Sequence, residues 1–112
     1  MKVYNSTRNV CIGENIDMAD NFISRTFGLI PKQLLKSGEG LVIKPCCSIH
    51  TFFMRFDIDV VFINKKGKVV AVYSDVKPFR ILPIHISSYF VLELCSGEIE
   101  NKNIQKGDII QL

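Results

Sequence analysis

The sequence lacks the features that define several large classes of protein. No apolar run approaches about 18 residues, which excludes a membrane-spanning helix. No apolar signal region follows the first residues, so we expect no secretory leader, no membrane partner and a cytoplasmic location. The 14 lysines and arginines are scattered, and the net charge is only +3. Nucleic acid is therefore an unfavoured partner, because nucleic-acid surfaces gather basic residues into patches.

The cysteines lack the spacing of a disulfide framework or of a structural zinc site. There are four, at Cys11, Cys46, Cys47 and Cys95, and a reducing cytoplasm would keep them as thiols. Cys46 and His50 are weak candidates for metal ligands, because zinc accepts thiolate and imidazole but needs four ligands in a structural site. We therefore predict no metal and no cofactor, and interpret the cysteines as small buried hydrophobic residues.

Length and composition are those of one ordinary globular domain. The 112 residues are 47% hydrophobic and 22% charged, which gives enough apolar surface for a core and too little charge for disorder. No linker, repeat or low-complexity stretch divides the chain. We therefore predict a single domain over residues 1–112.

Short apolar runs separated by turn residues predict a mainly β fold. Turns rather than helices connect most of these runs, so the strands are expected to pair antiparallel in a β-barrel or β-sandwich. About seven short strands are expected, drawn from residues 2–5, 9–12, 41–43, 49–54, 58–63, 68–73, 89–94 and 109–112.

One or two short helices are predicted near the N-terminus. Asp17 is a suitable N-cap for a helix that ends near Gly28, and Pro31 suits the first turn of a second helix through Leu35. A single helical turn is expected from Ser96 through Asn101. Glu93 interrupts a strand of apolar residues, which indicates that one face of that strand meets solvent.

The densest polar cluster lies inside the most apolar stretch, Ile49–Ile63. An unbroken strand of this length would be unusual, so we predict a bend at Arg55–Asp57. Asp59 lies within an otherwise apolar run, and a buried carboxylate is costly unless it is paired or hydrogen-bonded. It is therefore expected to accept bonds from the backbone N–H groups of a neighbouring loop, or to pair with Arg55 or Arg80.

The loop Lys77-Pro78-Phe79-Arg80 carries two cations and one aromatic ring. Such a loop either binds an anion or stacks on a ring, or it closes one end of a barrel. The candidate ligand-binding residues are therefore His50, Arg55, Asp59, Lys77 and Arg80.

The leading hypothesis is a non-enzymatic binding module for a small anionic ligand or a partner peptide. Polar residues converge on apolar strands here without a complete catalytic set. One alternative is an enzyme in which Cys46 or Cys47 is the nucleophile and His50 its base. Another is a purely structural or interaction protein, which a large exposed apolar patch around Phe79, Tyr89 or Phe90 would favour.

Several segments together resemble the domain of unknown function family 192. They are residues 25–30, 38–43, 50–63, 77–78, 91–94 and 107–108, of which the central block Phe52–Phe62 is the specific part. The resemblance implies a compact, mainly β fold with a short helix near the N-terminus, and it implies no activity. Asp57 stands where family members are expected to have proline, which supports the bend, whereas Asp59 matches the family motif.

Overall fold

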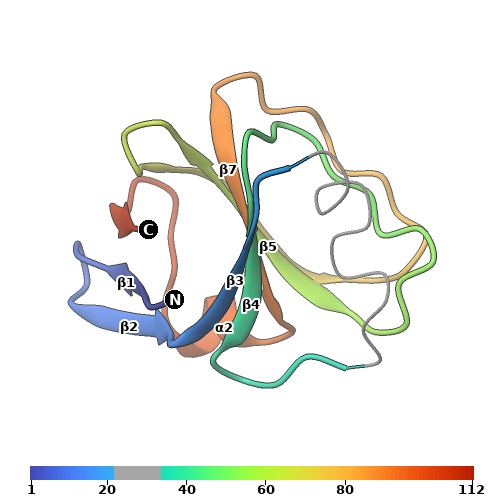
Figure 1. Ribbon diagram of the computed structural model, residues 1–112, viewed down its shortest axis with the longest axis horizontal. Coiled ribbons are helices and arrows are strands. Elements are labelled where there is room, and N and C mark those ends of the chain that lie inside the picture. The colour runs from blue at the N-terminus through green and yellow to red at the C-terminus, as the bar shows by residue number, and fades with distance from the viewer. Residues whose placement is uncertain (22–33) are drawn as a thin grey trace.

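The chain folds into two β-sheets with a short helix beside them (Figure 1). The computed structural model describes residues 1–21 and 34–112. One sheet has the strand order β2-β1-β8 and the other the order β3-β4-β7-β5-β6. The elements are β1 (Val3–Asn5), β2 (Val10–Gly13), β3 (Asn15–Ala19), β4 (Glu39–Ile43), β5 (Ile58–Asn64), β6 (Val69–Val76), β7 (Ser88–Cys95), α2 (Glu98–Asn101) and β8 (Ile110–Gln111). No helix in this described part of the chain is long and apolar enough to span a membrane.

The centre of the larger sheet is formed by its most apolar strands. All residues of β5 from Ile58 to Ile63 are buried, and the strand pairs with β7 on one side and β6 on the other. A strand that is apolar on both faces needs both faces covered, which places it in the middle of a layered structure. The hairpin from β5 to β6 turns at Gly67, whose φ of 88° is readily adopted only by glycine.

The two faces of this sheet are covered in different ways. The inner face packs against the three-stranded sheet, and its core includes Val61 and Leu92 together with Val3 and Ile110. The outer face carries the alternate residues of the same strands, such as Val60 and Phe62 of β5, in a second apolar cluster.

Two long connections cover much of the outer face. Residues 44–57 link β4 to β5 and residues 77–87 link β6 to β7, and we call these two segments the loop pair. They run side by side, joined by backbone bonds from Leu82 N–H to the Ile49 carbonyl (3.1 Å) and from His85 N–H to the Cys47 carbonyl (2.8 Å). In Figure 1 they lie on the side of the large sheet away from β1 and β2.

The structure corrects the predicted sheet architecture. The described strands form two separate sheets, so the barrel alternative is wrong and the two-layer alternative holds. Purely antiparallel pairing is also wrong, because β3 and β4 run parallel with Asn15 opposite Glu39 and Ala19 opposite Ile43. Parallel neighbours need a long crossover, and the connection between these two strands is long enough to supply it.

Two local predictions also fail. Asp17 does not cap a helix, because it lies in the middle of β3, and that strand also contains the next two residues of the predicted helix. The part of that helix from residue 22 onward, and most of the one from Pro31, lies outside the described residues. Residues 49–54 form no regular strand either and make only an isolated bridge between His50 and Ile81. The predicted bend is confirmed, since residues 55–57 are irregular and β5 begins only at Ile58.

Candidate functional site

Thr51 holds the two halves of the loop pair together. It is 1% exposed, and its N–H donates to the Arg80 carbonyl at 2.9 Å. Its hydroxyl donates to the Lys77 carbonyl at 2.6 Å and accepts the Arg80 N–H at 2.9 Å. The Thr51 carbonyl in turn accepts the Phe79 N–H at 3.0 Å. One buried threonine therefore fixes the path of residues 77–80, including the cation-rich loop identified in the sequence.

Two phenylalanines project from this clamped region into solvent. Phe53 is 70% exposed and Phe79 59% exposed, and their rings meet edge-to-face at 6.0 Å between centroids. Both residues have left-handed backbones, with φ of 65° and 62°. This region disfavours side chains with a Cβ by about 1–2 kcal/mol. The fold therefore keeps two bulky aromatic residues in strained positions without burying their rings.

Four of the five predicted site residues lie on the loop pair. His50, Arg55, Lys77 and Arg80 are all exposed there. The Lys77 ammonium donates to Asp57 at 2.5 Å, and this bond and the Asp57 charge raise the pKa of Lys77.

The two guanidinium groups carry charge that the loop pair does not neutralise. Within the described part of the chain, neither Arg55 nor Arg80 forms an ion pair. The Arg80 guanidinium donates to the Pro78 carbonyl at 3.4 Å, which holds it beside its own loop. Two guanidinium groups therefore remain available to an anion.

The fifth predicted residue, Asp59, lies on the opposite face of the sheet. Strand alternation puts its side chain on the inner face, where it is fully buried. One carboxylate oxygen accepts the Asp75 N–H at 2.9 Å, from a bulge of β6. The other accepts the N–H groups of Gly97 (3.1 Å) and Ile99 (2.8 Å), which stabilises the start of α2. The predicted bonding to loop N–H groups is confirmed, and Asp59 does not join the other four residues.

Glu93 is a buried carboxyl group, so the prediction that it marks a solvent-facing side of its strand is wrong. It lies in β7 opposite Leu41 and Val60, on the outer face, and is 3% exposed. Burial raises the pKa of Glu93 to about 8. Glu93 and Asp59 each stand as a single acidic residue in an otherwise apolar strand. The local sequence therefore cannot distinguish a buried carboxylate that is hydrogen-bonded from one that is only desolvated.

The thiol and imidazole of the alternative enzyme hypothesis bond to different partners. Cys46 Sγ donates to the Ser48 carbonyl at 2.9 Å, and His50 Nδ1 accepts the Phe52 N–H at 3.2 Å. All four cysteines are free thiols. Burial and the charges of nearby carboxylates, Glu98 foremost, raise the pKa of the Cys95 thiol, which disfavours the reactive thiolate. Among residues 1–21 and 34–112, no three metal-binding side chains are placed to hold an ion.

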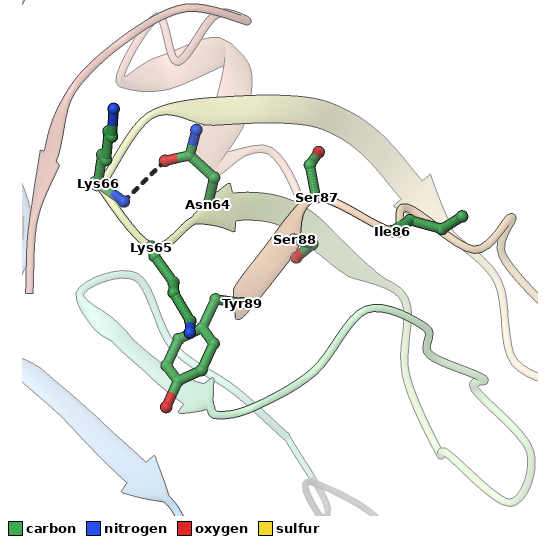
Figure 2. Close-up of a pocket in the computed structure, with 7 residues that line it drawn as sticks. All are labelled: Asn64, Lys65, Lys66, Ile86, Ser87, Ser88 and Tyr89. Carbon is green, nitrogen blue, oxygen red and sulfur yellow. Dashed lines mark hydrogen bonds between the residues drawn. The ribbon is translucent and has the colours of Figure 1, made fainter.

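A hollow of about 520 Å³ lies where the β5–β6 turn meets the start of β7. Figure 2 shows its residues, with Lys65 directed toward Tyr89 and with Ile86 and Ser87 pointing elsewhere. The Lys65 ammonium is 5.1 Å from the Tyr89 ring centroid, and the Ser88 hydroxyl lies 3.0 Å from the Cys46 carbonyl. Its polar groups diverge or are already bonded, so we place the candidate site on the loop pair.

The fold and the loop pair define a class of small two-sheet β proteins. Residues 3–112 match the family model DUF192, described as an uncharacterized ACR, and the chain belongs to this family. A UPF0127 protein of Pyrococcus furiosus is 32% identical over 110 residues, which cover 96% of this chain and 94% of the relative. One of Pyrococcus horikoshii is 31% identical over 112 residues, covering 97% and 96%. The resemblance seen in the sequence is therefore confirmed, and the family's description names no activity.

Two solved structures share the fold. A protein of unknown function from Novosphingobium aromaticivorans superposes with a TM-score of 0.85 at 18% identity, over 99% of this chain and 82% of the other. A proposed transcription regulator from Sinorhizobium meliloti gives a TM-score of 0.80 at 15% identity, over 98% and 89%. At such low identity the likeness establishes the arrangement of the strands alone.

Proposed function

We propose that this chain is a non-enzymatic binding module whose loop pair takes a small anionic ligand or a partner peptide. His50, Arg55, Lys77 and Arg80 are the candidate contact residues, and Asp59 has a structural role in the same domain. The binding would take place in the cytoplasm, where the four free thiols remain reduced.

The exposure of Phe53 and Phe79 is the observation that carries this proposal. Each ring is mostly exposed on a backbone that disfavours it, while Thr51 beneath them is buried and fully bonded. Strained residues that a rigid surrounding structure holds in place are concentrated at ligand-contact sites. Two exposed arginines on the same loops supply donors suited to a carboxylate or phosphate.

The structural or interaction protein alternative requires a large exposed apolar patch around Phe79, Tyr89 or Phe90. Phe79 is exposed as that alternative requires, whereas Phe90 is half-buried and packs against the inner core. The exposed apolar surface is thus centred on the loop pair. A binding module whose partner is a peptide or a protein would explain why these apolar side chains are exposed.

Amide chemical shifts measured by NMR would test the proposal. The probes are sodium phosphate, sodium acetate and short synthetic peptides of either charge, added separately to the labelled protein at constant ionic strength. We expect saturable shifts confined to residues 49–56 and 77–82, and their loss in the Arg55→Gln/Arg80→Gln double variant. The Lys106→Gln variant, which changes an exposed charge outside the loop pair, is the matched control. The absence of saturable shifts with every probe would contradict the proposal.

A further inference from the structure

We propose, on the basis of the binding function proposed above, that the loop pair docks an acidic protein segment carrying an aromatic or aliphatic anchor residue. The site combines exposed apolar side chains with uncompensated positive charge, and a partner must complement both. The choice of partner follows from three features of the loop pair: its charge, its apolar composition and its rigidity.

The charge of the loop pair favours an acidic partner. Residues 44–57 and 77–87 contain one carboxylate, Asp57, and Lys77 already binds it. Arg55 and Arg80 are left without an ion-pair partner among the described residues. A second copy of this chain would bring guanidinium groups against guanidinium groups, so self-association is disfavoured. The partner must supply the missing carboxylates itself.

The apolar composition favours a peptide over a nucleic acid. Beside the two phenylalanines, the connection 77–87 exposes Ile81 (73%), Ile84 (68%) and Ile86 (92%). Bases stack on aromatic rings and on arginine, whereas branched aliphatic side chains suit the aliphatic and aromatic side chains of proteins. A nucleic acid also needs a groove lined with many basic residues along its backbone, and the loop pair offers only two unpaired guanidinium groups.

The rigidity of the site favours a defined partner over a lipid surface. Thr51 fixes the backbone through four short hydrogen bonds, and the Phe53 and Phe79 rings contact each other. The Arg80 guanidinium is held at the Pro78 carbonyl. Aromatic side chains on a backbone fixed in this way resemble the central anchor residues of protein interfaces. A layer of lipid head groups requires no such fixed geometry.

Three peptides of equal length separate the contributions of charge and anchor. The first places phenylalanine and leucine between aspartates and glutamates, the second replaces both anchors by alanine, and the third replaces the acidic residues by lysine. Binding to the intact protein is followed by fluorescence anisotropy at fixed salt. We expect the first peptide to bind at least about 10-fold more tightly than either of the others.

Variants of the protein locate the interaction. Arg55→Gln and Arg80→Gln should each weaken binding of the first peptide about 5-fold to 10-fold, and Phe79→Asn about 10-fold. Lys106→Gln should leave it unchanged. Asparagine tolerates the left-handed backbone at residue 79, so this variant should fold, and its amide spectrum verifies that directly.

The outcomes distinguish this inference from the broader binding proposal. If phosphate or acetate binds the loop pair but the anchor peptide binds no more tightly than its alanine version, the inference is overturned and the binding proposal stands. Tighter binding to single-stranded oligonucleotides or to anionic vesicles than to the first peptide would also overturn it, as would concentration-dependent dimerisation through residues 77–87. If no probe binds, both proposals fail.

Discussion

The two faces of the large sheet bury a carboxyl group in opposite ways. On the inner face, Asp59 accepts three backbone N–H bonds and links β5 to the β6 bulge and to α2. On the outer face, Glu93 is as deeply buried, yet its pKa is shifted upward by burial. The inner carboxylate is a fully bonded part of the fold. The outer one lies opposite Leu41 and Val60 in the apolar outer face.

This difference leads us to expect that stability resides in the buried sheet, and that the proposed binding resides at the exposed tip of the loop pair, Phe53 and Phe79. The inner face is covered by the regular strands of the smaller sheet. The loop pair covers much of the outer face, with Thr51 buried and the rings of Phe53 and Phe79 exposed. Substitutions within the buried sheet and at the tip of the loop pair should therefore differ in kind, and the following predictions test that from the largest effect to the smallest.

Removing the inner carboxylate should have the largest effect. Asp59→Ala leaves three buried or partly buried N–H groups without their acceptor, and we expect a loss of about 3–5 kcal/mol in the free energy of unfolding. Asp59→Asn retains one acceptor oxygen and should lose less. Urea unfolding of both variants measures this, and a loss below about 1 kcal/mol in Asp59→Ala would refute the structural role of Asp59.

Neutralising the outer carboxyl group should have the opposite effect above neutral pH. Because the folded pKa of Glu93 lies near 8, above the ordinary 4.5, its stabilising contribution is complete below about pH 4.5 and is lost as the pH rises toward 8. Glu93→Gln does not titrate, so at pH 9 it should exceed the parent protein in stability by on the order of 3 kcal/mol.

The pH dependence of that difference is the decisive observation. Unfolding free energies of the parent and Glu93→Gln should diverge between about pH 5 and pH 8 and run parallel above it. Glu14→Gln, at an exposed position, is the matched control and should show no such divergence. Parallel curves throughout would mean that Glu93 is ionised in the folded protein.

A second bonded carboxylate extends the comparison to the smaller sheet. Asp108 accepts bonds from the Asn5 amide (2.8 Å), the Arg8 guanidinium (2.9 Å) and the Gln105 N–H (3.0 Å). Burial alone would raise the pKa of Asp108, but the bonds from Arg8 and Asn5 outweigh it and hold the pKa below its usual value. This ties the turn after β1 to the segment before β8.

Asp108→Asn should therefore destabilise the protein by about 2 kcal/mol at pH 7. The folded pKa is depressed, so the contribution of Asp108 is present above about pH 4 and is lost as the pH falls through the folded value. Thermal unfolding at pH 7 and pH 3 should show the difference from the parent shrinking at the lower pH. Asp20→Asn, at an exposed carboxylate, should show no difference at either pH.

The smallest effect on stability is expected at the tip of the loop pair. In Phe53→Asn, the backbone strain falls because asparagine adopts the left-handed conformation more readily, and this offsets the lost ring contact with Phe79. The free energy of unfolding should therefore change by less than about 1 kcal/mol. Phe62→Ala, which truncates a fully buried ring of β5, should lose about 3–5 kcal/mol and serves as the reference. Equal losses in the two variants would show that Phe53 belongs to the core.

The sequence predicted the parts of the fold that local pattern determines. The apolar run Ile58–Ile63 and the turn at Gly67 indicated the central hairpin, and the cost of burying a charge indicated how Asp59 would be bonded. The parallel pairing of β3 with β4 was missed because it depends on contacts across a long connection rather than on local pattern.

The candidate site was predicted in part. The sequence identified the cations of the loop pair. It could not show that the two connections lie side by side, because this depends on the bonds of Thr51 to residues 77–80, which are distant in sequence. The strand-like composition of residues 49–54 concealed an irregular segment with Phe53 in a left-handed conformation. Glu93 was misjudged because alternation within one strand cannot show what covers that strand's outer face.

The division between the buried sheet and the exposed tip of the loop pair can be tested most directly on a single variant. In Phe79→Asn, both the free energy of unfolding and the affinity for the acidic anchor peptide are measured on the same preparation. The division predicts a change in stability below about 1 kcal/mol together with a loss of about 10-fold or more in affinity. Unchanged affinity, or a loss of several kcal/mol in stability, would contradict it.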